Sequence, residues 1–132
     1  MVSIEETFGI SAGKIWQELA NSNKLTESEL IEICKSAKKY IYAGIGWLAR
    51  ENKIRKEGAE YLLGETNLTA TIGTNAGKVW NILNAKGGAT SVPNLRKYIK
   101  LSISEIYQAL GWLAKEGKLE YAGTNKETYK LK

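Results

Sequence analysis

The chain repeats itself once, and this repeat constrains its fold more than any single motif does. The segment Ala12–Trp16 (AGKIW) returns as Ala76–Trp80 (AGKVW), and Gly46–Ile54 returns in similar form as Gly111–Leu119. The two offsets are 64 and 65 positions, which is the size of a small domain near the lower limit for independent folding. We therefore predict two domains that pack on each other. Their predicted ranges are residues 1–66 and 67–132.

A capped helix is expected to open each half. Its apolar stripe at helical spacing consists of Ile15, Trp16 and Leu19 in the first half and of Val79, Trp80 and Leu83 in the second. Ser11 and Asn75 precede these stripes and are good N-caps, so we expect the helices to begin there. Because aromatic residues at helical spacing usually fill cores, we expect Trp16 and Trp80 to be buried.

Two further helices are predicted in each half. Residues 26–29 (TESE) form a capping box before a short second helix, and Pro93 occupies the first turn of its counterpart, whose apolar side is Leu95, Tyr98 and Ile99. Residues 102–105 (SISE) form another capping box before the third helix of the second half. Gly46 and Gly111 lie inside the third helices, where glycine costs about 1 kcal/mol relative to alanine. This cost favours a close approach of another helix at these positions.

Each half is expected to end in a β-hairpin. Residues 53–63 and 119–131 place β-prone residues on both sides of turns that contain glycine. Residues 67–72 alternate polar and apolar side chains and are predicted to form a linker strand between the halves.

Three helices followed by a hairpin are typical of a winged helix-turn-helix domain. We therefore predict a mainly helical α+β fold with two tandem winged helix-turn-helix domains, each of three helices and a β-hairpin wing. The Gly-Lys-Ile/Val-Trp motif and the Gly-Trp-Leu-Ala-Arg/Lys-Glu motif also resemble a family of small winged helix-turn-helix domains of unknown function from archaea and bacteria. The resemblance covers about residues 10–63 and 74–131. The resemblance implies the fold but does not imply a ligand.

The composition argues against several classes of function. Histidine and aspartate are absent and Cys34 is the only cysteine, so the commonest general base and metal ligands are missing. We predict no catalytic residues, no metal, no cofactor and no enzymatic activity. Cys34 is expected to be a buried, inert thiol, because no histidine can activate it. The chain has neither a membrane-spanning apolar run nor a signal peptide, which predicts a cytoplasmic protein without membrane contact.

The net charge of +5 is distributed unevenly between the halves. Residues 1–66 hold nine Lys/Arg and ten Glu, whereas residues 67–132 hold ten Lys/Arg and four Glu. Such asymmetry indicates either a half that binds a polyanion or a soluble surface whose charge has drifted.

In winged helices that bind DNA, the third helix enters the major groove and basic residues around it contact phosphates. The predicted DNA-binding residues of the first half are Lys35, Lys38, Lys39, Arg55 and Lys56. Those of the second half are Arg96, Lys97, Lys100, Ser104, Gln108, Lys126 and Lys130. Neither third helix has an arginine before its last turn, and Glu105 repels phosphate. We therefore predict weak, phosphate-dominated binding of double-stranded DNA by a transcriptional regulator or nucleoid-type factor, as a monomer or homodimer.

The alternative is a winged-helix protein–protein interaction module that does not bind nucleic acid. Its candidate anchors for a protein partner are Tyr42, Trp47, Tyr107 and Trp112. Trp47 and Trp112 lie one position off the apolar stripe of the third helix. They are expected either to pack under the wing or between the domains, or to face a partner. We favour DNA binding, on the charge asymmetry and on fold analogy.

Overall fold

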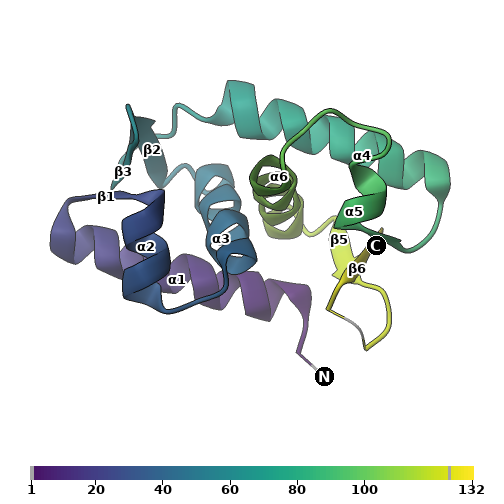
Figure 1. Cartoon of the computed structure of the whole chain (residues 1–132), viewed down its shortest axis with the longest axis horizontal. Coiled ribbons are helices and arrows are strands. Elements are labelled where there is room, and N and C mark those ends of the chain that lie inside the picture. The colour runs from purple at the N-terminus through teal and green to yellow at the C-terminus, as the bar shows by residue number, and fades with distance from the viewer. Residues whose placement is uncertain (1, 125) are drawn as a thin grey trace.

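Two similar units side by side make up the computed structural model, which describes residues 2–124 and 126–132 (Figure 1). Met1 and Asn125, which fall in the predicted first domain and second wing, lie outside the described residues. Unit 1 contains α1 (Ile4–Ser22), β1 (Lys24–Thr26), α2 (Glu27–Cys34), α3 (Lys38–Arg50), β2 (Ile54–Glu57) and β3 (Glu60–Leu63). Unit 2 contains η1 (Thr69–Gly73), α4 (Thr74–Lys86), β4 (Thr90–Ser91), α5 (Val92–Leu95), α6 (Ile103–Lys115), β5 (Leu119–Tyr121) and β6 (Thr128–Leu131). The predicted fold, mainly helical with two winged-helix units, is confirmed.

The strongest local signals in the sequence define where the second and third helices begin. The Thr26 hydroxyl accepts the Glu29 N–H at 3.2 Å, and the Glu29 carboxylate accepts the Thr26 N–H at 2.8 Å. Ser102 and Glu105 repeat this capping box at 3.1 and 2.9 Å. Pro93 lies in the first turn of α5, as predicted. Short polar motifs of this kind fix a helix start from local chemistry alone.

The starts of the two first helices differ from the prediction. Ser3 caps α1, accepting the Glu6 N–H at 3.1 Å, so α1 begins well before Ser11. Ser11 lies inside the helix, where its hydroxyl donates to the Thr7 carbonyl at 3.3 Å. Asn75 likewise lies within α4 and does not cap it. Predicting caps at Ser11 and Asn75 was wrong, because apolar residues further upstream are buried by tertiary contacts.

The predicted linker strand at residues 67–72 is also wrong, because η1 is a π-helical turn that leads directly into α4. Leu68 and Ile72 are 9% and 3% exposed. They are four positions apart, a spacing that fits one face of a helical turn as well as one face of a strand. Burial in a neighbouring core decides between the two conformations.

Each wing is part of a three-stranded antiparallel sheet. The strand orders are β1-β3-β2 in unit 1 and β4-β6-β5 in unit 2. The predicted hairpins supply two strands of each sheet, and a short strand before the second helix supplies the third. The pair Leu25 and Tyr61 joins β1 to β3, and Thr90 and Tyr129 join β4 to β6. The central strand of each sheet therefore carries a buried tyrosine, Tyr61 or Tyr129.

The two hydrophobic cores exchange segments between the units. Ile4 and Phe8 of α1 belong to the core of unit 2, where the Phe8 ring meets the Tyr121 ring edge-on with centroids 6.4 Å apart. Leu68 and Ile72 belong to the core of unit 1. Figure 1 shows α1 along one edge of the molecule and η1–α4 along the opposite edge, with α3 and α6 between them. Each unit thus completes the core of the other.

The two third helices, α3 and α6, pack directly on each other and form the most extensive helix–helix contact in the described structure. A Cβ atom at Gly46 would collide with the Gln108 carbonyl oxygen, and one at Gly111 would collide with the Ala43 carbonyl oxygen. Glycine is required at both positions, which confirms the close helix approach predicted from the sequence.

The tryptophans follow the prediction only in part. Trp47 and Trp112 are half-buried; Trp47 packs against both cores and lies next to Gly9, and Trp112 likewise packs against both and lies next to Gly73. Trp80 is half-buried against the core of unit 2. Trp16, however, is 42% exposed, so the prediction of a buried ring is wrong there. No helix among the described residues is long and apolar enough to span a bilayer.

Candidate nucleic-acid interface

Packing of α3 on α6 limits which part of each third helix can meet a ligand. In α3, six residues from Ala43 to Ala49 are buried, whereas Lys38 at its start is exposed. In α6, Ser102 and Ile103 are exposed at the start, and Ile106 to Ala114 face the interior at most positions. The accessible surfaces are therefore the first turn of each third helix and the loop before it.

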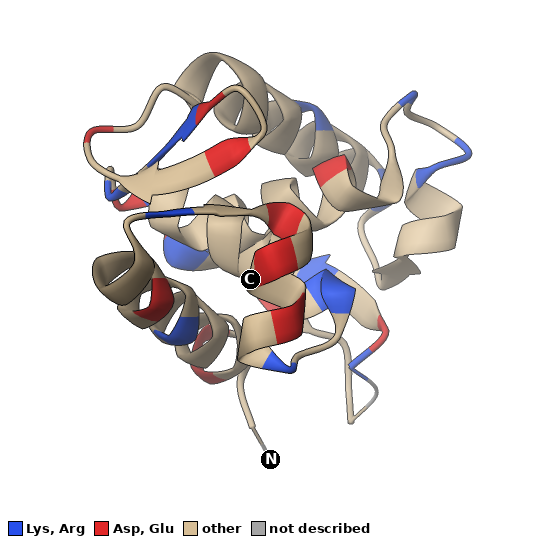
Figure 2. Ribbon diagram, turned by 60° about the vertical axis from the view of Figure 1, so that its left-hand side comes forward, with Lys and Arg blue, Asp and Glu red and all other residues tan. Residues whose placement is uncertain are grey.

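In unit 2 this loop is strongly basic. Arg96, Lys97, Tyr98 and Lys100 are all exposed, and we refer to residues 96–100 as the basic loop. None of its three cations forms an ion pair with a carboxylate of the residues that the structure describes. Figure 2 shows blue positions along the loop that joins α5 to α6 and no red position there. These charges are free to contact an external anion.

Lys86 and Lys130 extend the basic loop into a larger surface. Lys86 Nζ donates to the Tyr98 hydroxyl at 3.1 Å and lies 4.3 Å from the centre of its ring. This hydrogen bond lowers the pKa of Tyr98. Lys130 of the second wing lines a small cavity with Gly87 and Gly88, directly after Lys86. We call this surface, formed by the basic loop with Lys86 and Lys130, the basic end of unit 2.

The corresponding loop of unit 1 has a different charge balance. Lys35 and Lys38 are exposed, but Lys39 Nζ donates to a Glu127 carboxylate oxygen at 2.8 Å. Partial burial is the largest single influence on the Lys39 pKa and lowers it, but the hydrogen bond to Glu127 and the charge interactions with Glu127, Tyr40 and Tyr107 together raise this pKa. The preceding helix α2 also carries glutamates at positions 27, 29 and 32. Unit 1 therefore offers fewer free cations at this surface.

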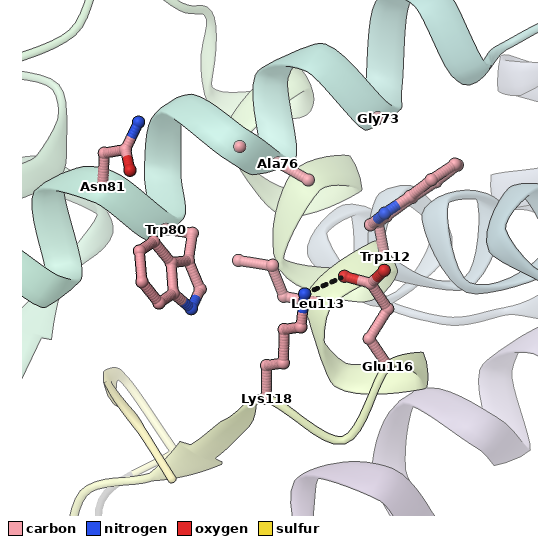
Figure 3. Close-up of a pocket in the computed structure, with 9 residues that line it drawn as sticks. Gly73, Ala76, Trp80, Asn81, Trp112, Leu113, Glu116 and Lys118 are labelled. Atoms are coloured by element: carbon pink, nitrogen blue, oxygen red, sulfur yellow. Dashed lines mark ion pairs between the residues drawn. The ribbon is translucent and has the colours of Figure 1, made fainter.

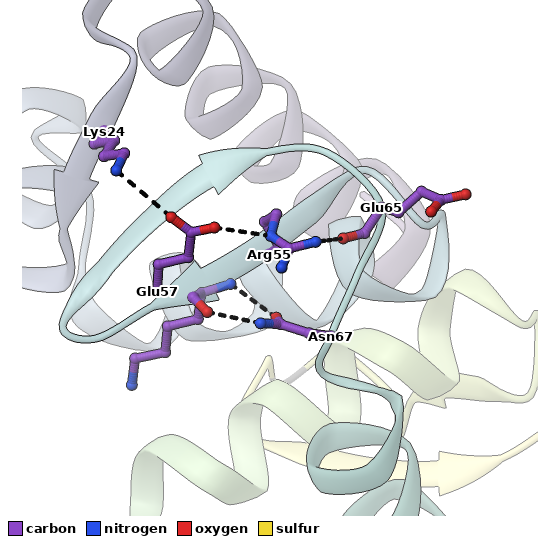
Figure 4. Close-up of polar contacts among 6 residues, drawn as sticks. Lys24, Arg55, Glu57, Glu65 and Asn67 are labelled. Carbon is purple, nitrogen blue, oxygen red and sulfur yellow. Dashed lines mark hydrogen bonds and ion pairs between the residues drawn. The ribbon is translucent and has the colours of Figure 1, made fainter.

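The first wing is tied down by its own polar contacts (Figure 4). Arg55 Nε lies 3.4 Å from the Glu57 carboxylate, which also lies 3.5 Å from Lys24 Nζ. A further Arg55 nitrogen, Nη1, donates to the Glu65 carbonyl at 3.1 Å. The Lys56 backbone is held by the Asn67 amide at 2.9 and 2.7 Å, while its ammonium group lies 5.4 Å from the Tyr61 ring centre. Arg55 is thus already occupied, whereas Lys56 stays exposed.

The remaining predicted contact residues of unit 2 are not gathered at one surface. The Ser104 hydroxyl lies 3.0 Å from that of Ser102, next to a helix start that the Glu105 carboxylate already closes. Gln108 is half-buried between the units, 3.5 Å from the Tyr61 hydroxyl. Lys126 is exposed on the second wing. The structure brings Arg96, Lys97 and Lys100 together but turns Gln108 away from them.

The candidate anchors for a protein partner are half-buried in contacts within the molecule. The Trp47 ring is covered by Lys115 Nζ at 5.3 Å, and the Trp112 ring by the Arg50 guanidinium at 5.8 Å. Both cations come from the other unit, so these rings take part in packing between the units. Tyr42 and Tyr107 are half-buried, and burial raises the pKa of both.

Sequence reasoning missed Lys86 and Tyr98. The sequence pattern predicts Tyr98 on the apolar side of a helix, but α5 ends at Leu95 and leaves Tyr98 59% exposed. A stronger signal was present: the sequence from Thr66 to Ser104 contains five Lys/Arg and no acidic residue. A run of one charge sign over a whole segment marks the basic end before any fold is known.

Comparison with known proteins identifies the family of the chain. No curated protein matches the sequence. One similar solved structure is that of the mRNA-binding domain of elongation factor SelB from E. coli in complex with SECIS RNA, at 13% identity and a TM-score of 0.37, over 92% of this chain and 97% of that one. Such low values do not transfer a ligand. The family described as "Winged helix-turn-helix domain (DUF2582)" matches residues 4–64 and again 67–131, and the chain therefore belongs to this family, with two copies in tandem.

Proposed function

We propose that the chain binds double-stranded DNA through the phosphate backbone, with the basic end of unit 2 as the contact surface. The observation that carries the proposal is the cluster of Arg96, Lys97 and Lys100, three exposed cations within five residues and without carboxylate partners in the described part of the chain. Each cation that neutralises a phosphate releases condensed counterions, which favours binding at low salt. Tyr98 adds an exposed phenol that can donate to a phosphate oxygen.

The same geometry argues against detailed reading of the base sequence. Base reading in the major groove needs a protruding helix with suitable side chains near its start. Here α3 and α6 face each other, and the Glu105 carboxylate occupies the first turn of α6. Under this proposal the chain binds DNA of many sequences weakly, as a nucleoid-type factor or an accessory transcriptional regulator would. Its two units in one chain take the place of a dimer.

A salt titration with a random-sequence duplex tests this proposal. We expect log K to fall linearly with log salt concentration between 50 and 200 mM, because phosphate contacts dominate. The Lys97→Glu, Lys100→Glu variant should bind at least about tenfold more weakly and show a shallower salt slope, reduced by about two. The matched control, Lys35→Glu with Lys38→Glu, changes the same charge in unit 1 and should have a smaller effect.

Two outcomes would overturn the proposal. One is the absence of binding even at 50 mM salt, which would leave a winged-helix protein-interaction module as the alternative. The other is an equal loss of affinity in the unit 1 and unit 2 variants, which would show that the basic end has no special part in binding.

A further inference from the structure

Each unit contains a pocket beside its third helix, and the two pockets are copies of each other. In unit 1 the pocket lies between α1 and the end of α3, with a volume of about 320 Å³; in unit 2 it lies between α4 and the end of α6, with about 390 Å³ (Figure 3). All eight residues that line the first pocket have an identical residue at the equivalent position of the second. The charged surfaces of the two units, by contrast, have diverged.

Internal packing explains only part of this identity. An added Cβ at Gly73 would lie 3.1 Å from the Trp112 ring, which is a tight contact, and one at Gly9 would lie 3.4 Å from the Trp47 ring, so packing favours a small residue at both positions. Gly13 and Gly77 are different. Each lies inside a helix, where glycine costs about 1 kcal/mol relative to alanine.

At both Gly13 and Gly77 an added Cβ would have no atom within 4 Å. The protein thus keeps a destabilising residue twice, at a position where its own packing does not need it. Trp16, 42% exposed at the rim of the first pocket, is a second feature that internal packing does not require.

The shape of the pocket suits a flat ring. In unit 2 the indole rings of Trp80 and Trp112 lie on opposite sides, with Ala76 on the helix between them (Figure 3). Gly77 adds bare backbone to the floor, so a planar group can approach the helix closely. Indole rings stack well on aromatic groups, and they bury a large apolar area when they do so.

The charges at the mouth favour an anion. The Glu116 carboxylate lies 3.0 Å from Arg50 Nε, which comes from the other unit, and 3.4 Å from Lys118 Nζ on the pocket side (Figure 3). Unit 1 repeats this arrangement: Glu51 lies 3.4 Å from Lys115 and 3.6 Å from Lys53. Two cations for each carboxylate leave one positive charge in excess. Since Arg50 and Lys115 belong to the packing between the units, the excess falls on Lys118 and Lys53, each 52% exposed.

We propose that each pocket binds a small planar aromatic anion, of the class of aromatic carboxylates. The ring of this ligand lies between the two tryptophans and over Gly13 or Gly77. Its anionic group meets the ammonium group of Lys53 or Lys118, at the end of the pocket that Glu51 or Glu116 closes. This site is separate from the basic end of unit 2 and does not depend on DNA binding.

The four tryptophans are the only indoles in the chain, and all four line the two pockets, so their N–H signals in a ¹H–¹⁵N spectrum report on ligand directly. With 2-naphthoate as probe, we expect saturable shifts of these signals with a Kd of about 1 mM or below, which is reasonable for a ligand of this size. Naphthalene-2-methanol lacks the charge and should bind at least about fivefold more weakly, as one lost ion contact predicts. Cyclohexanecarboxylate lacks the flat ring and should cause no saturable shift.

Paired variants distinguish a role of these residues in ligand binding from a role in the stability of the fold. Gly13→Leu with Gly77→Leu should abolish 2-naphthoate binding, because the new side chains occupy the floor. Gly13→Ala with Gly77→Ala should raise Tm and still weaken binding, which a purely structural role for these glycines does not predict. Lys53→Gln with Lys118→Gln should reduce the affinity for 2-naphthoate to that for the alcohol. Lys78→Leu, which adds the same leucine to α4 outside the pocket, is the matched control and should bind as the wild type does.

The proposal is overturned if 2-naphthoate causes no saturable indole shift in the wild-type protein. It is also overturned if the folded Gly13→Leu, Gly77→Leu variant binds the probe with unchanged affinity.

Discussion

The two third helices start differently and end alike. At the start of α6, Ser102 and Glu105 form a capping box, whereas Ala37 before α3 makes no side-chain cap and Lys38 and Lys39 fill the first turn. The later halves of both helices share the sequence Gly-Trp-Leu-Ala, followed by a basic residue and glutamate. The later halves carry Gly46 and Gly111, which allow the close contact between the units, whereas Lys38 and Ile103 at the starts are exposed. Packing has therefore held one half of each helix constant, while the other half has diverged.

The largest effect is expected from substitutions at the closest contact between α3 and α6. Gly46→Ala and Gly111→Ala each place a Cβ on a backbone carbonyl oxygen of the facing helix, so the helices must separate. We expect each variant to lose at least about 3 kcal/mol of the free energy of unfolding, measured in urea. The two losses should be similar, because the contacts are reciprocal.

Gly13→Ala is the matched control for this prediction. It is the same substitution inside a helix, but the new methyl group meets open space. It should stabilise the protein by about 0.5–1 kcal/mol. If Gly46→Ala proved as stable as Gly13→Ala, the close approach of α3 and α6 would be contradicted.

This contact also shows how far the sequence could predict the fold. Gly46, Gly111 and the two capping boxes carry local signals, and each led to a correct expectation. The start of α1 and the turn η1 carry weak local signals, since their conformation is set by burial of Phe8 and Ile72 in the core of the other unit. An exchange of segments between two cores cannot be seen from periodicity alone.

The candidate interface was predictable in composition more than in geometry. The charge pattern predicts Arg96, Lys97 and Lys100 as contact residues, and all three lie on one exposed loop. The sequence did not indicate that Lys39 would be bound by Glu127, 88 positions away, or that Gln108 would face the other unit. Such pairings depend on how the units pack, which no local pattern encodes.

The second largest effect concerns the buried tyrosines, which the two wings share. Burial raises the pKa of Tyr61 to about 12 and also raises that of Tyr129. Between pH 10 and 12 the unfolded chain loses the Tyr61 proton while the folded protein keeps it. The stabilisation is therefore complete well below pH 10, falls by at most about 1.4 kcal/mol per pH unit between pH 10 and 12, and has decreased by about 2.7 kcal/mol above pH 12.

Urea unfolding at pH 9, 10 and 11 measures this loss, with Tyr61→Phe and Tyr129→Phe as test variants. Each variant should remove about 1 kcal/mol of the stability loss between pH 10 and 11. An unchanged slope in both variants would show that these phenols are not buried in their neutral form.

The divergent helix starts should give a smaller effect of opposite sign in the two units. Ser102→Ala removes the hydroxyl that accepts the Glu105 N–H and should destabilise the protein by about 1 kcal/mol. Ala37→Ser supplies a cap where α3 has none and should stabilise it by a few tenths of a kcal/mol, since the Ala37 carbonyl already accepts the Tyr40 N–H at 3.0 Å. Chemical denaturation measures both changes. Equal effects in the two units would mean that the starts do not differ in capping.

The smallest effect is expected at the ion pairs that join the shared ends of the helices. Arg50 Nε lies 3.0 Å from the Glu116 carboxylate, and Lys115 Nζ lies 3.4 Å from that of Glu51. The Arg50 and Lys115 side chains are 46% and 37% exposed, so water screens both pairs. A double-mutant cycle with Arg50→Gln and Glu116→Gln should give a coupling free energy of about 0.5 kcal/mol, and the Lys115–Glu51 cycle should give less.

Both couplings should shrink in 1 M salt, because the Debye length there is only about 3 Å. A coupling that persisted in 1 M salt would instead point to packing of Arg50 on the Trp112 ring, which glutamine cannot reproduce. The comparison of the two cycles therefore shows whether charge or aromatic contact holds the shared ends together.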